Sequence, residues 1–228
     1  MSQPRLVEVR QNILKQNDLL ARALRQRFER EDVTVVSLVS SPGAGKTFLL
    51  EKILGHLHAD YRVGALVGDL ATENDAARLM RSGARVQQIT TGTVCHLDAQ
   101  MVENALQDWE LSELDFLFIE NVGNLVCPAS YDLGERLRLV LMSVTEGEDK
   151  PLKYPTIFNT ADAAVITKMD LASAAEFNLE LACANIESVR PGMPIFSVSG
   201  KSGAGMNELL ESLKTLLPSA AQKEMRPA

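Results

Sequence analysis

Short apolar runs rich in β-branched residues alternate with longer amphipathic stretches from residue 33 onward. Seven of these runs have the length and composition of buried strands, namely Val33–Val39, Val63–Val67, Val86–Ile89, Phe116–Ile119, Leu137–Val144, Ala163–Thr167 and Ile195–Val198. Helical patterns lie between most of them, at Lys46–His58, Asn74–Ser82, Asp98–Asp108, Ala172–Val189 and Met206–Leu217. Strands that are apolar on both faces and separated by helices are typical of a parallel sheet covered on both sides. We therefore expect an α/β fold with a mostly parallel sheet of about seven strands flanked by helices.

The segment before residue 31 has a purely helical pattern. Between Arg5 and Arg30 no glycine or proline occurs, and apolar residues recur on one helical face at Leu6, Val9, Ile13, Leu20, Leu24 and Phe28. We expect residues 1–30 to form a helix packed on the domain, although a helix that contacts a partner or a second protomer has the same pattern. Residues 31–218 are then one domain, and residues 219–228 are expected to form a flexible tail.

A glycine-rich turn joins the first predicted strand to the helix that follows it. The turn reads Ser40-Ser41-Pro42-Gly43-Ala44-Gly45-Lys46-Thr47 and is followed by Phe48. Its glycines let backbone N–H groups surround a phosphate, and the helix N-terminus adds its positive end. Lys46 can reach the β- and γ-phosphates, and the Thr47 hydroxyl can ligate Mg²⁺. Ser40 replaces the first glycine of the general motif, but the strand–turn–helix context still predicts a P-loop rather than an ordinary turn, with residues 42–48 contacting the nucleotide.

Acidic residues at the ends of two other predicted strands suit the magnesium side of such a site. Glu120 ends the fourth predicted strand, where most nucleotide switches have aspartate, and Gly123 can sense a γ-phosphate. Asp69 ends the second strand, and Asp75 follows it in an expected mobile loop, although an acid at a helix N-terminus serves the helix equally well. We expect Mg²⁺ to be held by Thr47, Asp69 and Glu120, and catalysis to depend on these three and Lys46.

Two later strand ends carry the residue types expected for a guanine site. The sixth predicted strand is followed by Lys168-Met169-Asp170, and Thr167 stands where the common guanine motif has asparagine. A carboxylate at Asp170 can accept two hydrogen bonds from guanine, whereas adenine offers no such donor pair, and the stem of Lys168 can cover the base. After the last strand, donors to the guanine carbonyl can come from Ser199, Gly200 and Lys201. We therefore expect GTP and GDP rather than ATP, with an ordinary strand-end lysine and aspartate as the alternative.

Two cysteines and a histidine follow the ends of predicted strands, where loops of parallel sheets bind ligands. Cys95 and His96 come after the third strand, and Cys127 lies just beyond Gly123. Two thiolates and one imidazole suit zinc, nickel or another borderline-soft divalent ion, and a second protomer can complete such a site by sharing ligands. Because Cys127 is close to the expected γ-phosphate sensor, the nucleotide can bias this metal site. Two unconnected buried thiols are the alternative, and Cys183 is expected to be such a thiol.

Composition and charge narrow the function classes. The 228 residues are 46% hydrophobic and 23% charged, as in an ordinary globular protein. A net charge of −7 disfavours binding to nucleic acid, and no apolar run approaches the roughly 20 residues that a membrane span needs. The first ten residues lack a secretory signal, and three cysteines do not make a disulfide framework. We expect a cytoplasmic protein that binds neither nucleic acid nor membrane.

These motifs together resemble the HypB family, the GTPases that assist nickel insertion into NiFe-hydrogenase. The stretches that carry the resemblance are residues 40–47, 92–99, 120–128 and 145–155. The resemblance implies a SIMIBI-type P-loop GTPase that hydrolyses GTP slowly and dimerises in its GTP state, with a zinc or nickel site at the interface made from Cys95, His96 and Cys127. It also implies two partners, a HypA-type nickel-binding accessory protein and the hydrogenase large-subunit precursor. Some members carry an N-terminal cysteine cluster or His-rich tract, which this sequence lacks, so nickel storage is not expected.

Three alternatives remain open on the sequence alone. The related urease-maturation GTPases have a similar P-loop but place a proline between the cysteine and the histidine, whereas Cys95 and His96 are adjacent here. A GTPase interaction switch with a purely structural zinc has the same ligands, and removal of its metal unfolds the protein. An ATP-using small-molecule kinase is disfavoured by Lys168 and Asp170.

Overall fold

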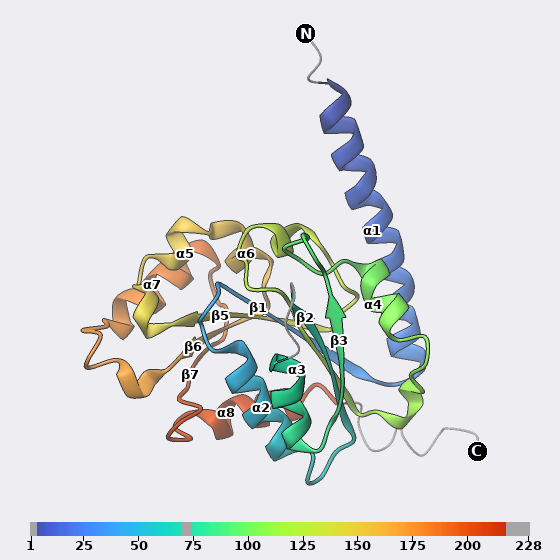
Figure 1. The fold of residues 1–228 in the computed structure, drawn as a ribbon. Coiled ribbons are helices and arrows are strands. Elements are labelled where there is room, and N and C mark those ends of the chain that lie inside the picture. The colour runs from blue at the N-terminus through green and yellow to red at the C-terminus, as the bar shows by residue number, and fades with distance from the viewer. Residues whose placement is uncertain (1–3, 70–73, 218–228) are drawn as a thin grey trace.

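A seven-stranded sheet forms the centre of the computed structural model, which describes residues 4–69 and 74–217 (Figure 1). The strand order is β3-β2-β4-β1-β5-β6-β7, and each neighbouring pair is parallel. The strands are β1 Thr34–Ser40, β2 Val63–Asp69, β3 Arg85–Thr90, β4 Phe116–Glu120, β5 Leu137–Ser143, β6 Ala163–Thr167 and β7 Ile195–Ser197. The expected fold class is confirmed, and the sheet is parallel at each of its pairings.

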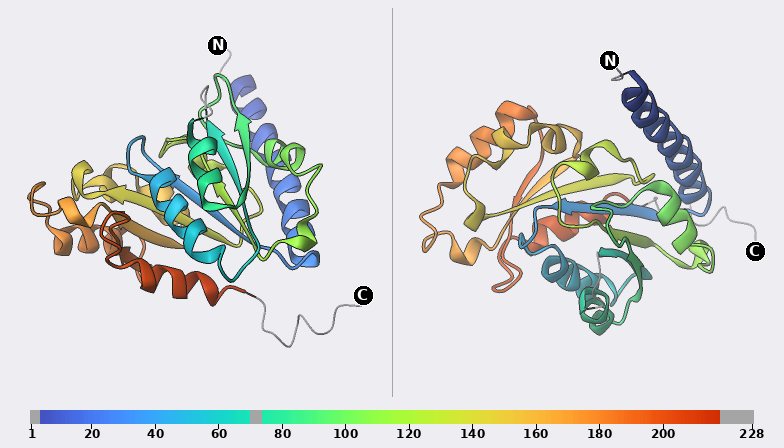
Figure 2. Two further views of the ribbon diagram at one scale, coloured as in Figure 1. Left: turned by 60° about the horizontal axis from the view of Figure 1, so that its bottom comes forward. Right: turned by 45° about the horizontal axis from the view of Figure 1, so that its top comes forward.

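Helices cover both faces of the sheet (Figure 2). They are α1 Pro4–Arg30, α2 Lys46–Leu57, α3 Asn74–Leu79, α4 Ala99–Ala105, α5 Lys150–Lys153, α6 Pro155–Thr160, α7 Leu179–Val189 and α8 Met206–Lys214. On one face α2, α3 and α8 form a core with Val36 and Leu38 of β1. On the other face Val35 packs with α1 and α4, and Val39 packs with α6 and α7. Alternate residues of one strand thus enter opposite cores, which explains why the strands are apolar throughout.

Helix α1 packs on the domain through its carboxyl-terminal half, while its other half extends away from the sheet (Figure 1). Ala21, Leu24 and Phe28 are buried in a cluster shared with α4. Ile13 and Leu19 are 53% and 61% exposed. Within the expected apolar stripe, Leu24 and Phe28 are therefore covered by the domain, whereas Ile13 is exposed.

Helix α7 begins later than the sequence predicts. The stretch Ala172–Val189 was expected to be helical throughout, but α7 starts at Leu179. The backbone of Glu176 has a positive φ of 49°, which a right-handed helix does not accommodate. The Asn178 side chain then caps α7 by accepting a hydrogen bond from the Leu181 N–H at 3.0 Å. The prediction for the first part of this stretch is therefore wrong.

Two other helical regions also differ from the prediction. Helix α4 begins after Asp98, which caps it through the Met101 N–H, and ends at Ala105 rather than at Asp108. Between β5 and β6 the chain forms α5 and α6, where no helix was predicted. Both are single-turn or nearly single-turn helices that begin with a proline at one of their first positions, and such short elements have no detectable apolar periodicity.

Residues 219–228, the expected flexible tail, lie outside the part of the chain that the structure describes. Among the helices of the described ranges, none combines the length and the apolar character needed to cross a bilayer.

Candidate nucleotide and metal site

The expected phosphate loop connects the carboxyl end of β1 to the N-terminus of α2. Gly43 and Gly45 have φ values of 77° and 90°, a region that residues with a side chain rarely occupy. Lys46 is the first residue of α2, so the backbone N–H groups of the loop and the helix dipole share one end of the element. The local geometry is that of a phosphate-binding turn.

Lys46 is buried at the base of this loop. Its Nζ donates to the hydroxyl of Ser40 at 3.0 Å, so the serine that replaces the motif's first glycine holds the lysine in place. Burial lowers the pKa of Lys46, and the carboxylates of Glu120, Asp75 and Glu146 oppose that decrease. Burial disfavours the charged ammonium, and phosphate oxygens bound in the loop would offset that cost.

Glu120 is the acidic residue that the structure places against the P-loop. Its Oε1 accepts a hydrogen bond from the Thr47 hydroxyl at 2.7 Å, while its Oε2 is buried with no hydrogen-bond partner among the described residues. Burial raises the pKa of Glu120 to about 7, in spite of Lys46 and the Thr47 hydrogen bond, and Asp75 and Asp69 raise it further. A buried oxygen without a hydrogen-bond partner lowers the stability of the fold, and coordination of a divalent cation by this oxygen would supply the missing interaction. This donor set fits Mg²⁺.

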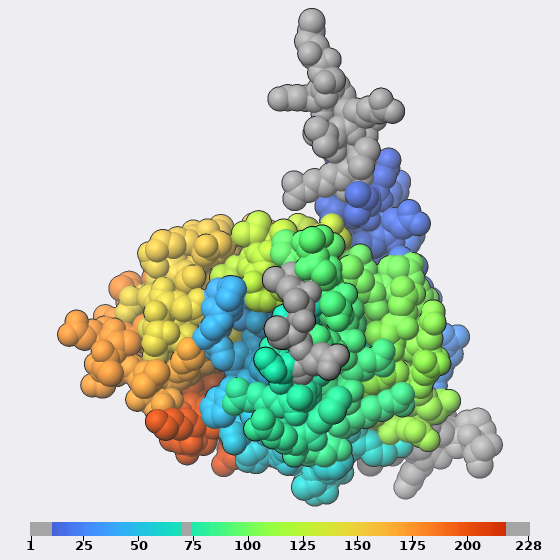
Figure 3. Space-filling view, viewed as in Figure 1, coloured from blue at the N-terminus to red at the C-terminus, as the bar shows by residue number. Residues whose placement is uncertain are grey.

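One cavity of about 420 Å³ brings most of the expected phosphate and magnesium residues together. Its lining includes Pro42, Gly43, Gly45, Lys46, Thr47, Phe48, Asp69, Asp75, Glu120 and Gly123. Ala44 is buried beneath the loop. A Cβ on Gly123 would lie 3.0 Å from Pro42 Cα, tighter than ordinary packing, so glycine favours the close approach of the segment after β4 to the loop. The blue segment after β1 and the yellow-green segment after β4 meet at the surface in Figure 3.

A second cavity, of about 330 Å³, adjoins the first because both are lined by Gly45 and Phe48. Its walls include the expected base-binding residues Lys168, Asp170, Gly200 and Lys201. Ser199 is fully buried, and its hydroxyl donates to Asp170 Oδ1 at 2.6 Å. This bond fixes one oxygen of the carboxylate that was expected to read guanine, and it joins the loop after β6 to the loop after β7.

The expected metal ligands form a compact cluster at the same end of the sheet. Ligand atoms of Cys95, His96 and Cys127 all lie within 4.8 Å of one another, and the two Sγ atoms are 3.1 Å apart. The His96 ring lies against Tyr131, with centroids 3.9 Å apart, and its Nδ1 is buried with no hydrogen-bond partner in the described residues. Burial lowers the pKa of His96, although Asp98 opposes this, and the lower pKa favours the neutral imidazole that ligation requires. Two sulfurs and one nitrogen suit a borderline-soft divalent ion.

Known proteins resemble the chain over most of its length. A family model described as CobW/HypB/UreG, nucleotide-binding domain, matches residues 34–197. The hydrogenase maturation factor HypB of Rhizobium leguminosarum bv. viciae is 46% identical over 226 residues, which are 99% of this chain and 75% of that relative. The chain belongs to the HypB family.

HypB of Helicobacter pylori is similar to the chain both in sequence and in structure. The hydrogenase/urease maturation factor HypB of Helicobacter pylori is 41% identical over 206 residues, 89% of this chain and 84% of the relative. The crystal structure of HypB from Helicobacter pylori in complex with nickel has a TM-score of 0.82 at 42% identity, covering 90% of this chain and 98% of that one. The resemblance seen in the sequence is thus confirmed, and the chain has the GTP-binding P-loop domain of this GTPase family.

Within this HypB-family site, several contacts had no sequence signal. The Thr167 hydroxyl donates to the Ala44 carbonyl at 2.6 Å, so threonine connects β6 to the P-loop where the common motif has asparagine. Lys168 Nζ donates to the Gly43 carbonyl at 2.7 Å, which draws its stem across the loop. Ser41 donates to Glu146, whose role could not be found from spacing because 105 residues separate the two. Such bonds depend on which loops the sheet order makes neighbours.

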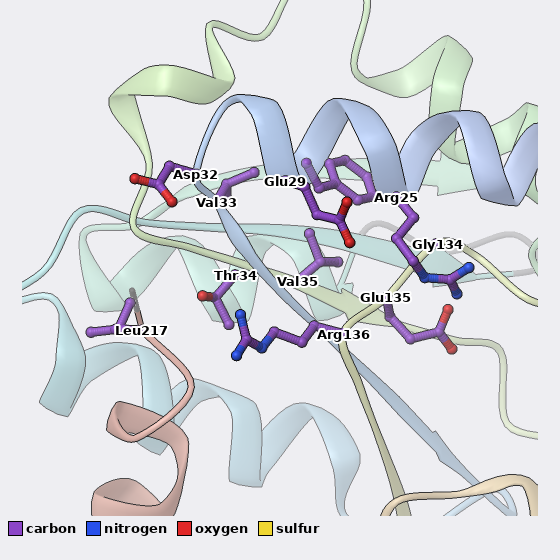
Figure 4. Close-up of a pocket in the computed structure, with 11 residues that line it drawn as sticks. Arg25, Glu29, Asp32, Val33, Thr34, Val35, Gly134, Glu135, Arg136 and Leu217 are labelled. Atoms are coloured by element: carbon purple, nitrogen blue, oxygen red, sulfur yellow. The ribbon is translucent and has the colours of Figure 1, made fainter. Parts of the chain in front are cut away.

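Another cavity, of about 470 Å³, lies away from this HypB-family site. It is bounded by the end of α1, the start of β1 and residues 134–136, so it is at the amino end of the strands. Figure 4 shows acidic and basic side chains together around it, including Arg25, Glu29, Glu135 and Arg136. The mixture of charges does not match a triphosphate, and the nucleotide residues lie at the opposite end of β1.

Proposed function

We propose that this chain is a GTP-hydrolysing metallochaperone that assists nickel insertion into the large subunit of NiFe-hydrogenase. One observation carries the proposal: a single segment, residues 120–127, contributes to both the phosphate cavity and the cysteine–histidine cluster. Glu120 at its start bonds Thr47, Gly123 approaches Pro42, and Cys127 at its end lies beside Cys95. Loss of the γ-phosphate can therefore shift Glu120 and Gly123, and only a few residues separate them from the metal ligand Cys127.

Guanine is the base we propose for the second cavity. Asp170 keeps Oδ2 for a donor of the base while Oδ1 is held by Ser199, and Lys168 lies across the P-loop where its stem can cover a base face. A carboxylate recognises the paired N–H donors of guanine, which adenine lacks. Gly200 and Lys201 also line this cavity and follow the buried Ser199, and backbone donors of this segment are proposed to reach the guanine carbonyl.

GTP hydrolysis is proposed for the first cavity. In this proposal Lys46 neutralises the β- and γ-phosphates, and Thr47, Asp69 and Glu120 hold Mg²⁺. That ion, when bound, offsets the negative charge that develops on the phosphate oxygens. Asp75 and Gly123 line the same cavity, and we propose that Gly123 senses the γ-phosphate through its backbone. Hydrolysis then removes the group on which the position of the segment 120–127 depends.

Nickel is the proposed cargo, with zinc as an alternative occupant of Cys95, His96 and Cys127. The HypB of Helicobacter pylori, 42% identical, has been crystallised with nickel, which supports this assignment. Three ligands leave a four-coordinate site incomplete, and a two-fold dimer of the GTP state can complete it by sharing ligands. Val126, next to Cys127, is 63% exposed and offers an apolar side chain for the proposed dimer contact beside the metal site.

The proposed partners are a HypA-type nickel-binding protein as donor and the hydrogenase large-subunit precursor as recipient. Neither nucleic acid nor membrane is part of the proposal. We place the activity in the cytoplasm, because GTP is available there and thiolate ligands such as Cys95 stay reduced. Delivery to urease is a second candidate, since the Helicobacter pylori relative is named for both hydrogenase and urease.

The test measures Ni²⁺ and Zn²⁺ binding stoichiometry with GDP and with a non-hydrolysable GTP analogue, both with Mg²⁺, while light scattering follows mass. We expect a dimer with the analogue and metal, and a metal affinity that differs between the two nucleotides. Cys95→Ala and Cys127→Ala should each remove the site, whereas Cys183→Ala on α7 should not. A metal affinity that is the same with GDP and with the GTP analogue, and that Cys95→Ala and Cys127→Ala leave unchanged, would overturn the proposal.

Removal of the metal with a chelator distinguishes a metal-delivery site from a purely structural zinc site. A delivery site empties with a chelator and refills while the protein stays folded, whereas a structural site unfolds the protein when it empties. Circular dichroism during chelation, followed by metal return, distinguishes the two outcomes. Unfolding on chelation would favour the structural zinc.

A further inference from the structure

The side chain of Asn121 lies between the phosphate cavity and the metal cluster. Asn121 follows Glu120 directly, is 2% exposed, and contributes to the lining of the cavity that contains Lys46 and Thr47. Its Oδ1 accepts a hydrogen bond from the Leu97 N–H at 3.0 Å. Leu97 is the residue after His96, so this amide joins the segment after β4 to the backbone that carries a metal ligand.

The same residue is fixed on the nucleotide side. Its backbone N–H donates to the Leu38 carbonyl of β1 at 3.0 Å, so it continues the pairing of β4 with the strand that leads into the P-loop. Its Oδ1 also accepts from the Val122 N–H at 2.9 Å, which shapes the turn into Gly123. One side-chain oxygen therefore receives an N–H from each of the two segments.

A second asparagine makes a weaker link between the same two segments. Asn124 donates from Nδ2 to the Cys95 carbonyl at 3.3 Å, and its Oδ1 accepts from the Val126 N–H at 2.8 Å. It is less buried than Asn121 and does not line the phosphate cavity. Of the two, only Asn121 both lines the phosphate cavity and bonds the backbone of the metal-ligand segment.

We infer that Asn121 is the positioning residue through which the nucleotide state acts on the metal cluster. This rests on the proposed function, in which GTP and GDP states bind the metal with different affinities. When Gly123 moves with respect to the P-loop, the turn at Val122 moves with it. The shared Oδ1 transmits that displacement to the backbone N–H of Leu97 and hence to His96. Without this oxygen the two segments respond separately.

Asn17 provides a matched control on the other side of the metal loop. It is also buried, at 5% exposure, and its Oδ1 accepts from the Ala99 N–H at 2.9 Å. Its Nδ2 donates to the Asp132 carbonyl beside Tyr131, so it holds the loop to α1 and not to the nucleotide segment. Loss of Asn17 should loosen the cluster equally in both nucleotide states.

The experiment measures the Ni²⁺ dissociation constant by competition with a chelator, in saturating Mg²⁺–GDP and in a saturating Mg²⁺–GTP analogue. The ratio of the two constants is the coupling, which for linked sites is typically about 5- to 150-fold. In Asn121→Ala we expect the ratio to fall to within about twofold of one, with both ligands still bound. In Asn17→Ala both constants should rise together and the ratio should persist. The thiolate-to-Ni²⁺ absorption band should change on nucleotide exchange in the wild type and Asn17→Ala but not in Asn121→Ala.

A second variant covers the case in which Asn121→Ala fails to fold. Asn121→Asp keeps an acceptor oxygen for the Leu97 and Val122 N–H groups, so it should retain the coupling once nucleotide is saturating. A wild-type ratio of one would defeat the proposed function itself. A wild-type ratio well above one that persists in Asn121→Ala, or that Asn121→Asp abolishes, would refute the role of Asn121 alone.

Discussion

Substitution of Glu120 by glutamine should stabilise the nucleotide-free protein while it damages the magnesium site. Glutamine keeps the size of the side chain and can still accept from the Thr47 hydroxyl, but it removes a carboxylate that is 3% exposed. In the wild type, burial removes water from that carboxylate and so disfavours its ionised form. Asp69 and Asp75 disfavour the charge further. The neutral amide avoids this cost.

The magnitude follows from the pKa of Glu120, which burial raises from 4.5 to about 7. A carboxyl whose folded pKa lies above its unfolded pKa stabilises the fold fully below pH 4.5 and loses that contribution as the pH rises through 7. Between pH 5 and pH 8 the wild type should lose about 2–3 kcal/mol through this group. The glutamine variant should not, so its advantage in free energy of unfolding should grow by that amount.

Urea denaturation of both proteins at pH 5, 6, 7 and 8, with EDTA and without nucleotide, measures the difference directly. Groups that do not interact with residue 120 titrate alike in both proteins and cancel in the comparison, so the difference reports Glu120 together with its interactions with Lys46, Asp69 and Asp75. Addition of Mg²⁺ and GDP should reverse the order, because the wild type gains the binding free energy of the complex and the variant gains less. A difference that stays constant across this pH range, or that grows towards acid, would refute the reasoning.

Three other substitutions, one of them with a control in α6, test separate contacts. Asp170→Asn should weaken GTP binding by about 10- to 100-fold and shift preference towards xanthosine triphosphate, as nucleotide competition would reveal; unchanged GTP preference would contradict the base assignment. Thr167→Val removes the buried donor to the Ala44 carbonyl and should cost about 1–2 kcal/mol of stability by thermal unfolding. Thr160→Val, which loses only a local bond to Ile157 within α6, should cost less, and equal losses would argue against the P-loop contact. Asn17→Leu leaves the Ala99 N–H and the Asp132 carbonyl unpaired and should cost about 1–3 kcal/mol in urea unfolding even without metal; a neutral result would mean that this buried bridge is dispensable.

The sheet could be predicted from the sequence because its strands are buried on both faces. All seven predicted runs became strands, since an apolar run with helices before and after it has few other ways to satisfy its backbone. Helix ends were harder, because caps such as Asn178 and Asp98 act through single hydrogen bonds that compete with helical periodicity. The helices α5 and α6 are too short for any periodicity to appear.

The site could be predicted where adjacent residues carry the chemistry. The P-loop and the Cys95–His96 pair are visible because their groups are contiguous, and the sheet then places Cys127 beside them. Asn121 and Asn17 were not predicted, since an isolated asparagine has many local roles and its partners lie far away in the sequence. Strand order determines those partners, and the sequence pattern does not contain it.

That strand order also governs when the molecule can acquire its shape. Strand β1 lies between β4 and β5, so Thr34 pairs with Phe116 and Val36 with Leu137, about 80 and 100 residues further along. During synthesis the first strand emerges early and has no neighbour until the fourth and fifth are made. Pairings of such long range form slowly, and an unpaired apolar strand can associate with other chains in the meantime. In a nascent chain that ends before residue 143, β1 lacks its neighbour β5. The P-loop follows β1, so we expect nucleotide to stabilise this protein only after most of the chain has left the ribosome.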